Sequence, residues 1–369
     1  MRTVGVLILA GILGTSGSAW CNDLAPTFLR SISTVKYKHV TIQPDGTALA
    51  VSKDGVILKD PAGGTRFVAR LKGNQRVVTS RDATAFGVTT YLDHSPTTLS
   101  VSKFDLYDAM GKRKFRLTKP KAKEFKISNA GQWTVGIASG EGMLEADLFL
   151  YNHLGEQVAM WKVPYLSEIT LPDSGDRFFA TSRNELWAYP YDGGDPHPFG
   201  RHESYSMNAS GRWVALSGAG SISLFDGISL VYTAKTHLNQ LRTVAVSPSG
   251  RYVALAGRDR LELFDRVAGE QVWTVTSGRE SLVFISIALS ESPLLVLCGL
   301  DEDRGSTFPA SERHKSGALF LLAENGKLIW RENLKYTKWS FKIPGVSFVG
   351  DGKQFEVELS EERRHYQLP

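Results

Sequence analysis

The longest polar connection in the sequence, residues 301–315, carries the residue types best suited to ligand chemistry. Its acidic triplet supplies carboxylate oxygens of the kind that hold calcium, and its cations could bind an anionic group. The triplet lacks the spaced oxygens and central glycine of an EF-hand loop, so we predict a ligand-binding loop without assigning a metal to it. The alternative is a solvated insertion with no ligand. The candidate ligand-binding residues in this loop are Asp301, Glu302, Asp303, Arg304, Arg313 and His314.

Two shorter connections, residues 93–96 and 140–145, occur at the equivalent position of earlier repeats and add His94 and Glu141 to the candidate ligand-binding residues. Long connections without structure of their own are often functional. Because all three connections join the same pair of strands in their repeats, we expect them to project from one side of the fold. We call this side the loop-rich face.

Other chemical groupings in the sequence do not have the specificity of a catalytic motif. His197 and His202, with Asp192, Asp195 and Glu203 nearby, suggest a metal site, but their spacing lies on a loop and a strand rather than on one helix. Asp192 also begins an Asp-Gly-Gly sequence that is typical of a hairpin turn. The sequence contains no Gly-x-Ser-x-Gly elbow and no phosphate-binding glycine loop. We therefore predict no catalytic residue and no metal site.

A repeated phrase organises the chain: an apolar strand that ends in a small polar residue, a tight turn, and a second apolar strand. Val246-Ser-Pro-Ser-Gly250 is a clear example, and the chain holds eight copies, two of them degenerate. A third strand follows each copy, and a turn rich in Asp, Asn and Gly supplies the positive φ that a hairpin to the fourth strand needs. Four short strands in a unit of roughly 40 residues are typical of a β-propeller blade.

The number of turns predicts how the last blade is completed. The turn between the first and second strands of a repeat occurs eight times, but the turn between the third and fourth strands occurs seven times. The reason is that the last repeat ends after its third strand, Arg363 to Leu368. An N-terminal strand near residues 28–35 would complete that blade and cover its exposed edge. We predict an all-β fold, a single β-propeller over residues 20–369 with eight four-stranded blades. Seven blades remain the alternative, if the copy near Leu289 or the copy near Asp82 is an insertion.

Several repeats resemble known propeller families. Asp265, Gly269 and Trp273 have the spacing of the tryptophan-docking motif of quinoprotein-type propellers. Residues 185–194 are similar to a repeat of the periplasmic Tol-type propeller, and the Ser-Pro-Ser-Gly phrase is similar to WD-repeat proteins. Shortened or lengthened versions of the docking motif end at Trp330 and Trp161.

The resemblance implies the β-propeller superfamily of the WD-repeat-like or quinoprotein-like type, and a structural role for the docking tryptophans between blades. Quinoprotein dehydrogenases use pyrroloquinoline quinone with a calcium ion and often stack it on two adjacent cysteines, a pair that this chain lacks. The exported eight-bladed propeller of outer-membrane-barrel assembly is similar in design and has no enzymatic activity.

Residues 1–19 have the pattern of a secretory signal peptide, with Arg2, a short apolar run and then small residues. No later segment is apolar for long enough to cross a membrane as a helix. Lipidation of Cys21 stays open, although Trp20 is bulky where a lipoprotein signal has a small residue. Cys298 lies in an apolar run and is expected to be a small buried hydrophobe. We expect a periplasmic or secreted protein.

The net charge of +5 is mild, and the basic cluster from Lys112 to Lys126 could either bind an anionic surface or form a solvated sheet edge. Export makes nucleic acid an unexpected partner. We therefore predict an exported, monomeric, non-enzymatic binding scaffold that recognises a protein or glycan of the cell envelope through its loop-rich face, without a cofactor. The alternative is a propeller enzyme such as a quinone-dependent oxidoreductase, with calcium and quinone as cofactors.

Overall fold

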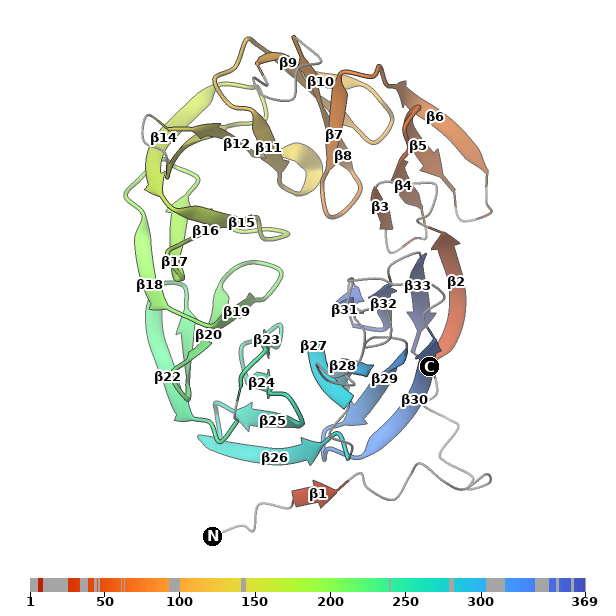
Figure 1. Cartoon of the computed structure of the whole chain (residues 1–369), viewed down its shortest axis with the longest axis vertical. Coiled ribbons are helices and arrows are strands. Elements are labelled where there is room, and N and C mark those ends of the chain that lie inside the picture. The colour runs from red at the N-terminus through yellow and green to blue at the C-terminus, as the bar shows by residue number, and fades with distance from the viewer. Residues whose placement is uncertain are drawn as a thin grey trace, which may run out of the picture. The chain divides into compact units, whose positions relative to one another are not determined.

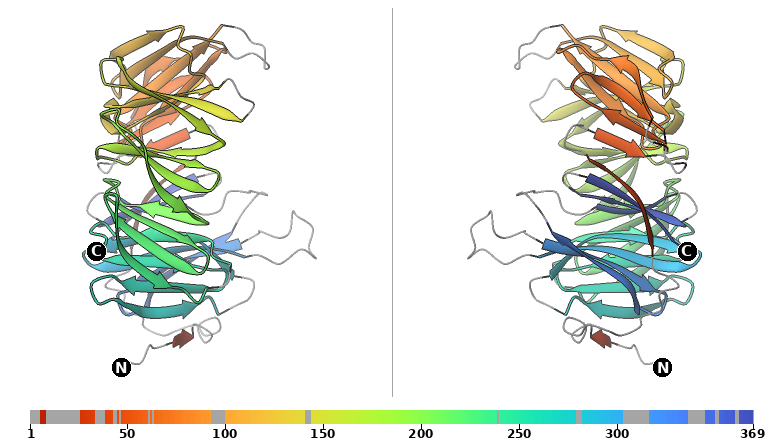
Figure 2. Two further views of the ribbon diagram at one scale, coloured as in Figure 1. Left: turned by 90° about the vertical axis from the view of Figure 1, so that its left-hand side faces the viewer. Right: turned by 90° about the vertical axis from the view of Figure 1, so that its right-hand side faces the viewer.

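In a computed structural model, the chain forms eight antiparallel four-stranded blades (Figures 1 and 2). One of these blades carries an additional short strand. The structure describes residues 6–8, 26–33, 39–42, 45, 47–60, 62, 64–92, 100–140, 144–238, 240–278, 282–302, 316–335, 345–349, 352–359 and 362–368. Within these ranges the helical content is the single 3-10 turn η2 (Asn129–Gly131). The prediction of an all-β propeller with eight blades is confirmed.

The first of two compact units, Thr34–Arg201 with Ala209–Gly211, contains blades 1 to 4. Blade 1 consists of β3 (His39–Ile42), β4 (Ala48–Val51), β5 (Gly55–Lys59) and β6 (Thr65–Arg70). Blade 2 consists of β7 (Gln75–Thr79), β8 (Ala85–Tyr91), β9 (Val101–Asp108) and β10 (Arg113–Thr118). Blade 3 consists of β11 (Glu124–Ile127), β12 (Thr134–Ser139), β13 (Glu145–Tyr151) and β14 (Gln157–Pro164). Blade 4 consists of β15 (Leu166–Thr170), β16 (Arg177–Ser182), β17 (Glu185–Pro190) and β18 (His197–Arg201).

The second unit, Met1–Ser33 with His202–Asn208 and Arg212–Pro369, contains blades 5 to 8. Blade 5 consists of β19 (Ser204–Met207), β20 (Trp213–Gly218), β21 (Ser221–Asp226) and β22 (Ser229–Lys235). Blade 6 consists of β23 (Thr243–Val246), β24 (Tyr252–Ala256), β25 (Arg260–Asp265) and β26 (Glu270–Thr276), with β1 (Val6–Ile8) parallel to β26. Blade 7 consists of β27 (Leu282–Glu291), β28 (Leu294–Glu302), β29 (Ser316–Ala323) and β30 (Leu328–Lys335). Blade 8 consists of β31 (Gly345–Val349), β32 (Gln354–Glu358), β33 (Glu362–Gln367) and β2 (Thr27–Ser33).

Blade 8 joins the two ends of the chain, as the turn count predicted. The N-terminal strand β2 pairs antiparallel with β33, with Thr27 opposite Gln367 and Ser33 opposite Glu362. The copy of the repeat near Leu289 belongs to a full blade, whose first two strands are longer than those of the other repeats. The alternative of seven blades is therefore wrong.

The small polar residue that ends the first strand of a blade closes the following turn. Side-chain oxygens of Ser80, Ser128, Asn208 and Ser247 each accept a hydrogen bond from the backbone N–H five residues later, at 2.9 to 3.1 Å. A hydroxyl or amide at this position satisfies a backbone donor that a tight turn would leave unpaired. In blades 2, 3, 5 and 6 the repeated phrase in the sequence is thus a repeated hydrogen bond in the structure.

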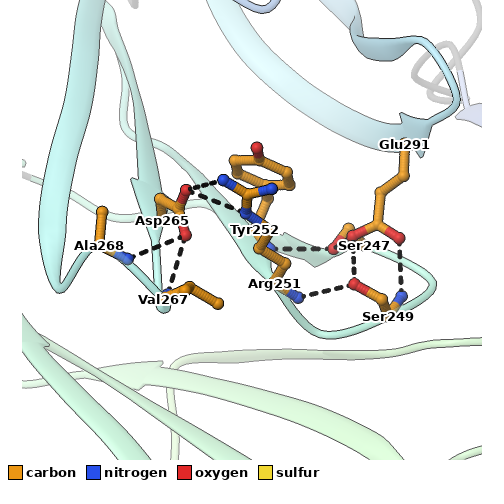
Figure 3. Close-up of polar contacts among 8 residues, drawn as sticks. All are labelled: Ser247, Ser249, Arg251, Tyr252, Asp265, Val267, Ala268 and Glu291. Carbon is orange, nitrogen blue, oxygen red and sulfur yellow. Dashed lines mark hydrogen bonds and ion pairs between the residues drawn. The ribbon is translucent and has the colours of Figure 1, made fainter.

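In blade 6 this turn is also bound to the next blade (Figure 3). The carboxylate of Glu291, at the end of β27, accepts hydrogen bonds from the Ser247 and Ser249 hydroxyls at 2.6 Å each. It also accepts the backbone N–H of Ser249 at 3.0 Å. A single carboxylate therefore joins blade 7 to the first turn of blade 6.

Beside this turn, Arg251 and Asp265 form an ion pair across β24 and β25, at 2.8 Å (Figure 3). Burial acts to raise the pKa of Asp265, but hydrogen bonds from Arg251 and from the backbone N–H groups of Val267 and Ala268 outweigh it and lower the pKa. The aspartate of the proposed docking motif is therefore a structural anchor for the turn between β25 and β26.

Tryptophans join successive blades within each unit. Trp273 of blade 6 is 3% exposed, and its indole Nε1 donates a hydrogen bond to the Glu324 carbonyl of blade 7 at 2.7 Å. Trp161 of blade 3 meets the blade 4 ring of Tyr189 edge-on, with 5.3 Å between centroids. Trp330 of blade 7 contacts Tyr366 of blade 8 in the same way, at 5.6 Å. These contacts agree with the structural role that the resemblance implied.

The apolar core lies between blades, because each sheet is apolar on both faces. Phe104 of blade 2 and Phe125 of blade 3 stack with 4.0 Å between centroids, and Leu148 of blade 3 is buried together with Phe178 of blade 4. Cys298, in the middle of β28, is completely buried as predicted, and burial raises the pKa of its thiol.

The predicted signal peptide lies largely outside the described residues, which include only Val6–Ile8 of it, and Cys21 also lies outside them. Within the described part of the chain, the structure contains no helix with the length and apolar character needed to cross a membrane.

Candidate functional site

The structure places the candidate residues of the 301–315 segment in two groups. Asp301 and Glu302 are the last two residues of β28, and Asp301 is buried between Val283 and Gly317 in the ladder. The acidic pair therefore belongs to a strand, whereas the sequence had placed it in a loop. The remaining candidates, Asp303, Arg304, Arg313, His314, His94 and Glu141, lie outside the described residues.

Two residues of the histidine cluster near residue 200 form local contacts. Asp192 accepts the backbone N–H of Gly194 at 2.9 Å, as expected of a hairpin turn. The ring of His197 packs edge-on against Phe199. Among the described residues, no group of three or more His, Cys, Asp or Glu side chains has a geometry suited to a metal ion.

A groove of about 610 Å³ lies on the loop-rich face of the first unit, where connections between second and third strands meet connections from one blade to the next. Part of its wall comes from Leu144 and Glu145 of the 140–145 connection, one of the three that the sequence marked as candidates, and from Ser139 directly before it. We call it the blade 2–4 groove. Its lining residues are Arg76, Tyr91, Lys123, Glu124, Lys126, Ile137, Ala138, Ser139, Leu144, Glu145, Ala146, Tyr165, Leu166, Ser167, Glu168 and Ile169.

Tyr165 forms the most distinctive wall of this groove. It connects β14 to β15 with a φ of 51°, a left-handed conformation that is uncommon for a bulky residue and costs free energy. Its backbone N–H donates to the Leu144 carbonyl at 2.6 Å, which fixes the strained residue against the start of β13. Tyr165 and Leu144 remain 42% and 57% exposed, so an aromatic and an aliphatic side chain stand together at the surface.

The guanidinium of Arg183 covers one face of the Tyr165 ring, with its central carbon 4.0 Å from the ring centroid. Arg183 lies in the two-residue turn between β16 and β17, where it and Asn184 both have positive φ, as a tight hairpin turn requires. A cation over an aromatic face stabilises the pair by about 0.5–1 kcal/mol at an exposed site. The cation therefore restrains the tyrosine ring at the surface.

The opposite wall of the groove is built around Tyr91, at the end of β8. Its hydroxyl donates to the Lys123 carbonyl at 3.2 Å, and the Arg76 guanidinium lies 5.4 Å from the ring centroid. Burial raises the pKa of Tyr91, so the phenol stays neutral and serves as a hydrogen-bond donor. Three exposed cations and three exposed carboxylates line the groove: Arg76, Lys123, Lys126, Glu124, Glu145 and Glu168.

Sequence reasoning missed Tyr165 and Arg183. Each occupies a short connection without a motif of its own, and the contacts that place it come from two neighbouring blades. The nearby basic cluster of residues 112–126 is divided between the groove, which Lys123 and Lys126 line, and the blade edge, where Arg116 pairs with the buried Asp105 at 2.6 Å.

Eight blades with this strand order define the chain as a β-propeller. No protein-family model and no curated protein sequence matches it. It is similar in structure to Kluyveromyces lactis Hsv2 with loop 6CD replaced by a Gly-Ser linker, with a TM-score of 0.53 and 13% identity over 79% of this chain and 96% of that one. It is also similar to BamB from Moraxella catarrhalis, with a TM-score of 0.53 and 12% identity over 93% of this chain and 100% of that one. At this level of identity the likeness concerns the fold alone.

Proposed function

We propose that this chain is an exported, non-enzymatic binding scaffold, periplasmic or secreted, which holds a protein partner in the blade 2–4 groove. The observation that carries the proposal is the exposed Tyr165, held at positive φ between the Leu144 carbonyl and the Arg183 guanidinium. Tyrosine and arginine are the residue types that dominate binding energy in protein interfaces. A ring that is already fixed loses little conformational entropy when a partner covers it.

The charge distribution of the groove supports a protein rather than a uniformly charged polymer. Its exposed charges are balanced, three of each sign, around an apolar and aromatic centre. An apolar anchor surrounded by polar groups of both signs is the usual design of a protein-binding surface. The tryptophan contacts between blades support the further proposal that the propeller is of the quinoprotein-like type, used here as a scaffold.

Affinity capture from a cell-envelope extract tests the proposal when variants are compared. The mature wild-type chain, Tyr165→Ala and the control Leu154→Ala are immobilised in equal amounts, after melting curves show that each is folded. Leu154 is 61% exposed and lies in the turn at the opposite end of β13 from Leu144. Loss of a hot-spot side chain costs about 2 kcal/mol or more, which is about 30-fold in affinity.

We expect a partner that the wild-type chain and Leu154→Ala recover equally, and that Tyr165→Ala recovers at least ten-fold less. Equal recovery by Tyr165→Ala would contradict the proposal, as would a partner that is lost with Leu154→Ala.

A further inference from the structure

A second hollow, of about 390 Å³, lies on the loop-rich face of the second unit beside blades 5 and 6. Its walls come from the residue before β19, the turn between β20 and β21, and the connection from β22 to β23. We call it the blade 5–6 pocket. Its lining residues are Glu203, Gly218, Gly220, Ser221, Thr236, Leu238, Gln240 and Leu241, with no Lys, Arg or His among these described residues.

A buried carboxyl group, for which the described part of the chain supplies no cationic partner, lies directly behind this pocket. Glu262, in β25, is 1% exposed, and the one side-chain hydrogen bond found for it among the described residues comes from the Thr236 hydroxyl, at 2.7 Å. Two other buried carboxylates are each paired with an arginine: Asp105 with Arg116 and Asp265 with Arg251. Burial of a carboxylate costs free energy unless a cation compensates it.

Thr236 connects the buried carboxylate to the pocket. Its hydroxyl oxygen accepts the backbone N–H of Leu238 at 3.1 Å and donates its proton to Glu262. Its single donor and one of its acceptor sites are thereby used, and the two bonds fix its position. The Glu262 carboxyl group therefore lies one side chain behind the pocket wall.

A second carboxylate stands on the wall itself. Glu203 is exposed, and its Oε1 accepts the backbone N–H of Ala219 at 3.3 Å. Within the described residues no ion pair is found for Glu203 or for Glu262. Leu238 and Leu241 supply apolar surface beside them.

The two connections that frame the pocket contain strained residues. Ala219 has a φ of 51° and Gln240 a φ of 55°, both in the left-handed region that non-glycine residues rarely adopt. The turn Ala219–Gly220 is a tight hairpin, which accounts for Ala219. Gln240 lies in the longer connection between β22 and β23.

We propose that the blade 5–6 pocket binds an alkylammonium or alkylguanidinium group. The cationic head lies against Glu203, with the Glu262 carboxyl group behind Thr236, and the alkyl stem packs on Leu238 and Leu241, as the stems of lysine and arginine do elsewhere. The group belongs either to a free amine or to a lysine or arginine side chain of a partner. This site is independent of the blade 2–4 groove, so either can fail without the other.

Ligand-observed NMR titration of the mature protein tests the proposal with n-butylammonium, n-butylguanidinium and the uncharged n-butanol as probes. A ligand of this size is expected to bind with a Kd of about 1 mM. The variants are Glu203→Gln, Glu262→Gln and the matched control Glu270→Gln, which removes an equal charge at an exposed position at the start of β26.

We expect both cations to bind, n-butanol to bind at least ten-fold more weakly, and Glu203→Gln to weaken cation binding at least ten-fold. Glu262→Gln should weaken it by a smaller factor with its melting curve retained, and Glu270→Gln should have no effect. Equal binding of n-butanol, or unchanged affinity in Glu203→Gln, would overturn the proposal. N-acetyl-lysine methylamide identifies the source: tighter binding than n-butylammonium assigns a partner's side chain, and equal or weaker binding assigns a free amine.

Discussion

Replacement of Trp273 by alanine measures how strongly the indole contacts hold one blade to the next. The side chain is 3% exposed, and Gly326 of the following blade lies so close that an added Cβ would be 3.2 Å from the ring. A tryptophan buries roughly 150–250 Å², which corresponds to about 4–6 kcal/mol at roughly 25 cal/mol per Å². Measured truncations of buried Phe and Trp cost about 3–5 kcal/mol. We expect Trp273→Ala to lower the free energy of unfolding by about 4 kcal/mol.

The conservative variant Trp273→Phe separates packing from hydrogen bonding. It keeps an aromatic ring but leaves the Glu324 carbonyl without its indole donor, a loss of about 1–2 kcal/mol. Guanidinium denaturation followed by far-UV circular dichroism gives the unfolding free energies of both Trp273 variants. The control is Val267→Ala, at a 67% exposed position, which should change stability by less than about 0.5 kcal/mol. A loss below about 1 kcal/mol for Trp273→Ala, or equal losses for both variants, would refute the docking role.

Three further predictions concern the turns of blades 5 and 6. Glu291→Ala removes three hydrogen bonds between blades and should lower the unfolding free energy in urea by about 2 kcal/mol. A change below about 0.5 kcal/mol would show that this carboxylate does not join the two blades. Gly250→Ala should cost more than about 3 kcal/mol, because its φ is +72° and an added Cβ would be 2.0 Å from the Trp213 ring. Gly227→Ala, at a φ of +61° with open space around it, should cost only about 1–2 kcal/mol. Equal melting temperatures for Gly250→Ala and Gly227→Ala would contradict the steric conflict with Trp213. Because the folded-state pKa of Asp265 is lowered, its contribution to stability is present at neutral pH and is lost as the pH falls below about 4. Asp265→Asn should therefore reduce the change of unfolding free energy with pH, measured by denaturation at a series of pH values. An unchanged pH dependence in this variant would contradict the role of the ion pair.

The architecture was readable from the sequence because each blade repeats the same local chemistry. The polar residue at the end of the first strand, as at Ser247, and the glycine that follows it mark one turn per blade, so counting turns counted blades. The missing fourth strand of the last repeat predicted the pairing of β2 with β33. Both inferences depend on short-range patterns, which a single sequence displays directly.

The candidate site was predicted only as a side of the molecule. The charges of Asp301 and Glu302 were interpreted as the start of a loop. In the structure, the pairing of β28 with β27 and β29 continues through Asp301. The length of a strand depends on partner strands that are distant in the sequence, which a local pattern does not reveal. The blade 2–4 groove combines residues from Arg76 to Ile169, and no local pattern marks such a set. The exposure of Tyr165 likewise depends on the packing of two blades.

Site-specific photo-crosslinking tests directly whether a protein partner covers the blade 2–4 groove. A benzophenone amino acid is placed at Leu144, or at Leu154 at the other end of β13, and cells that express each variant are irradiated. We predict a crosslinked protein from position 144, which is abolished when Tyr165→Ala is added, and none from position 154. A crosslink from position 154 with none from position 144 would contradict the proposal.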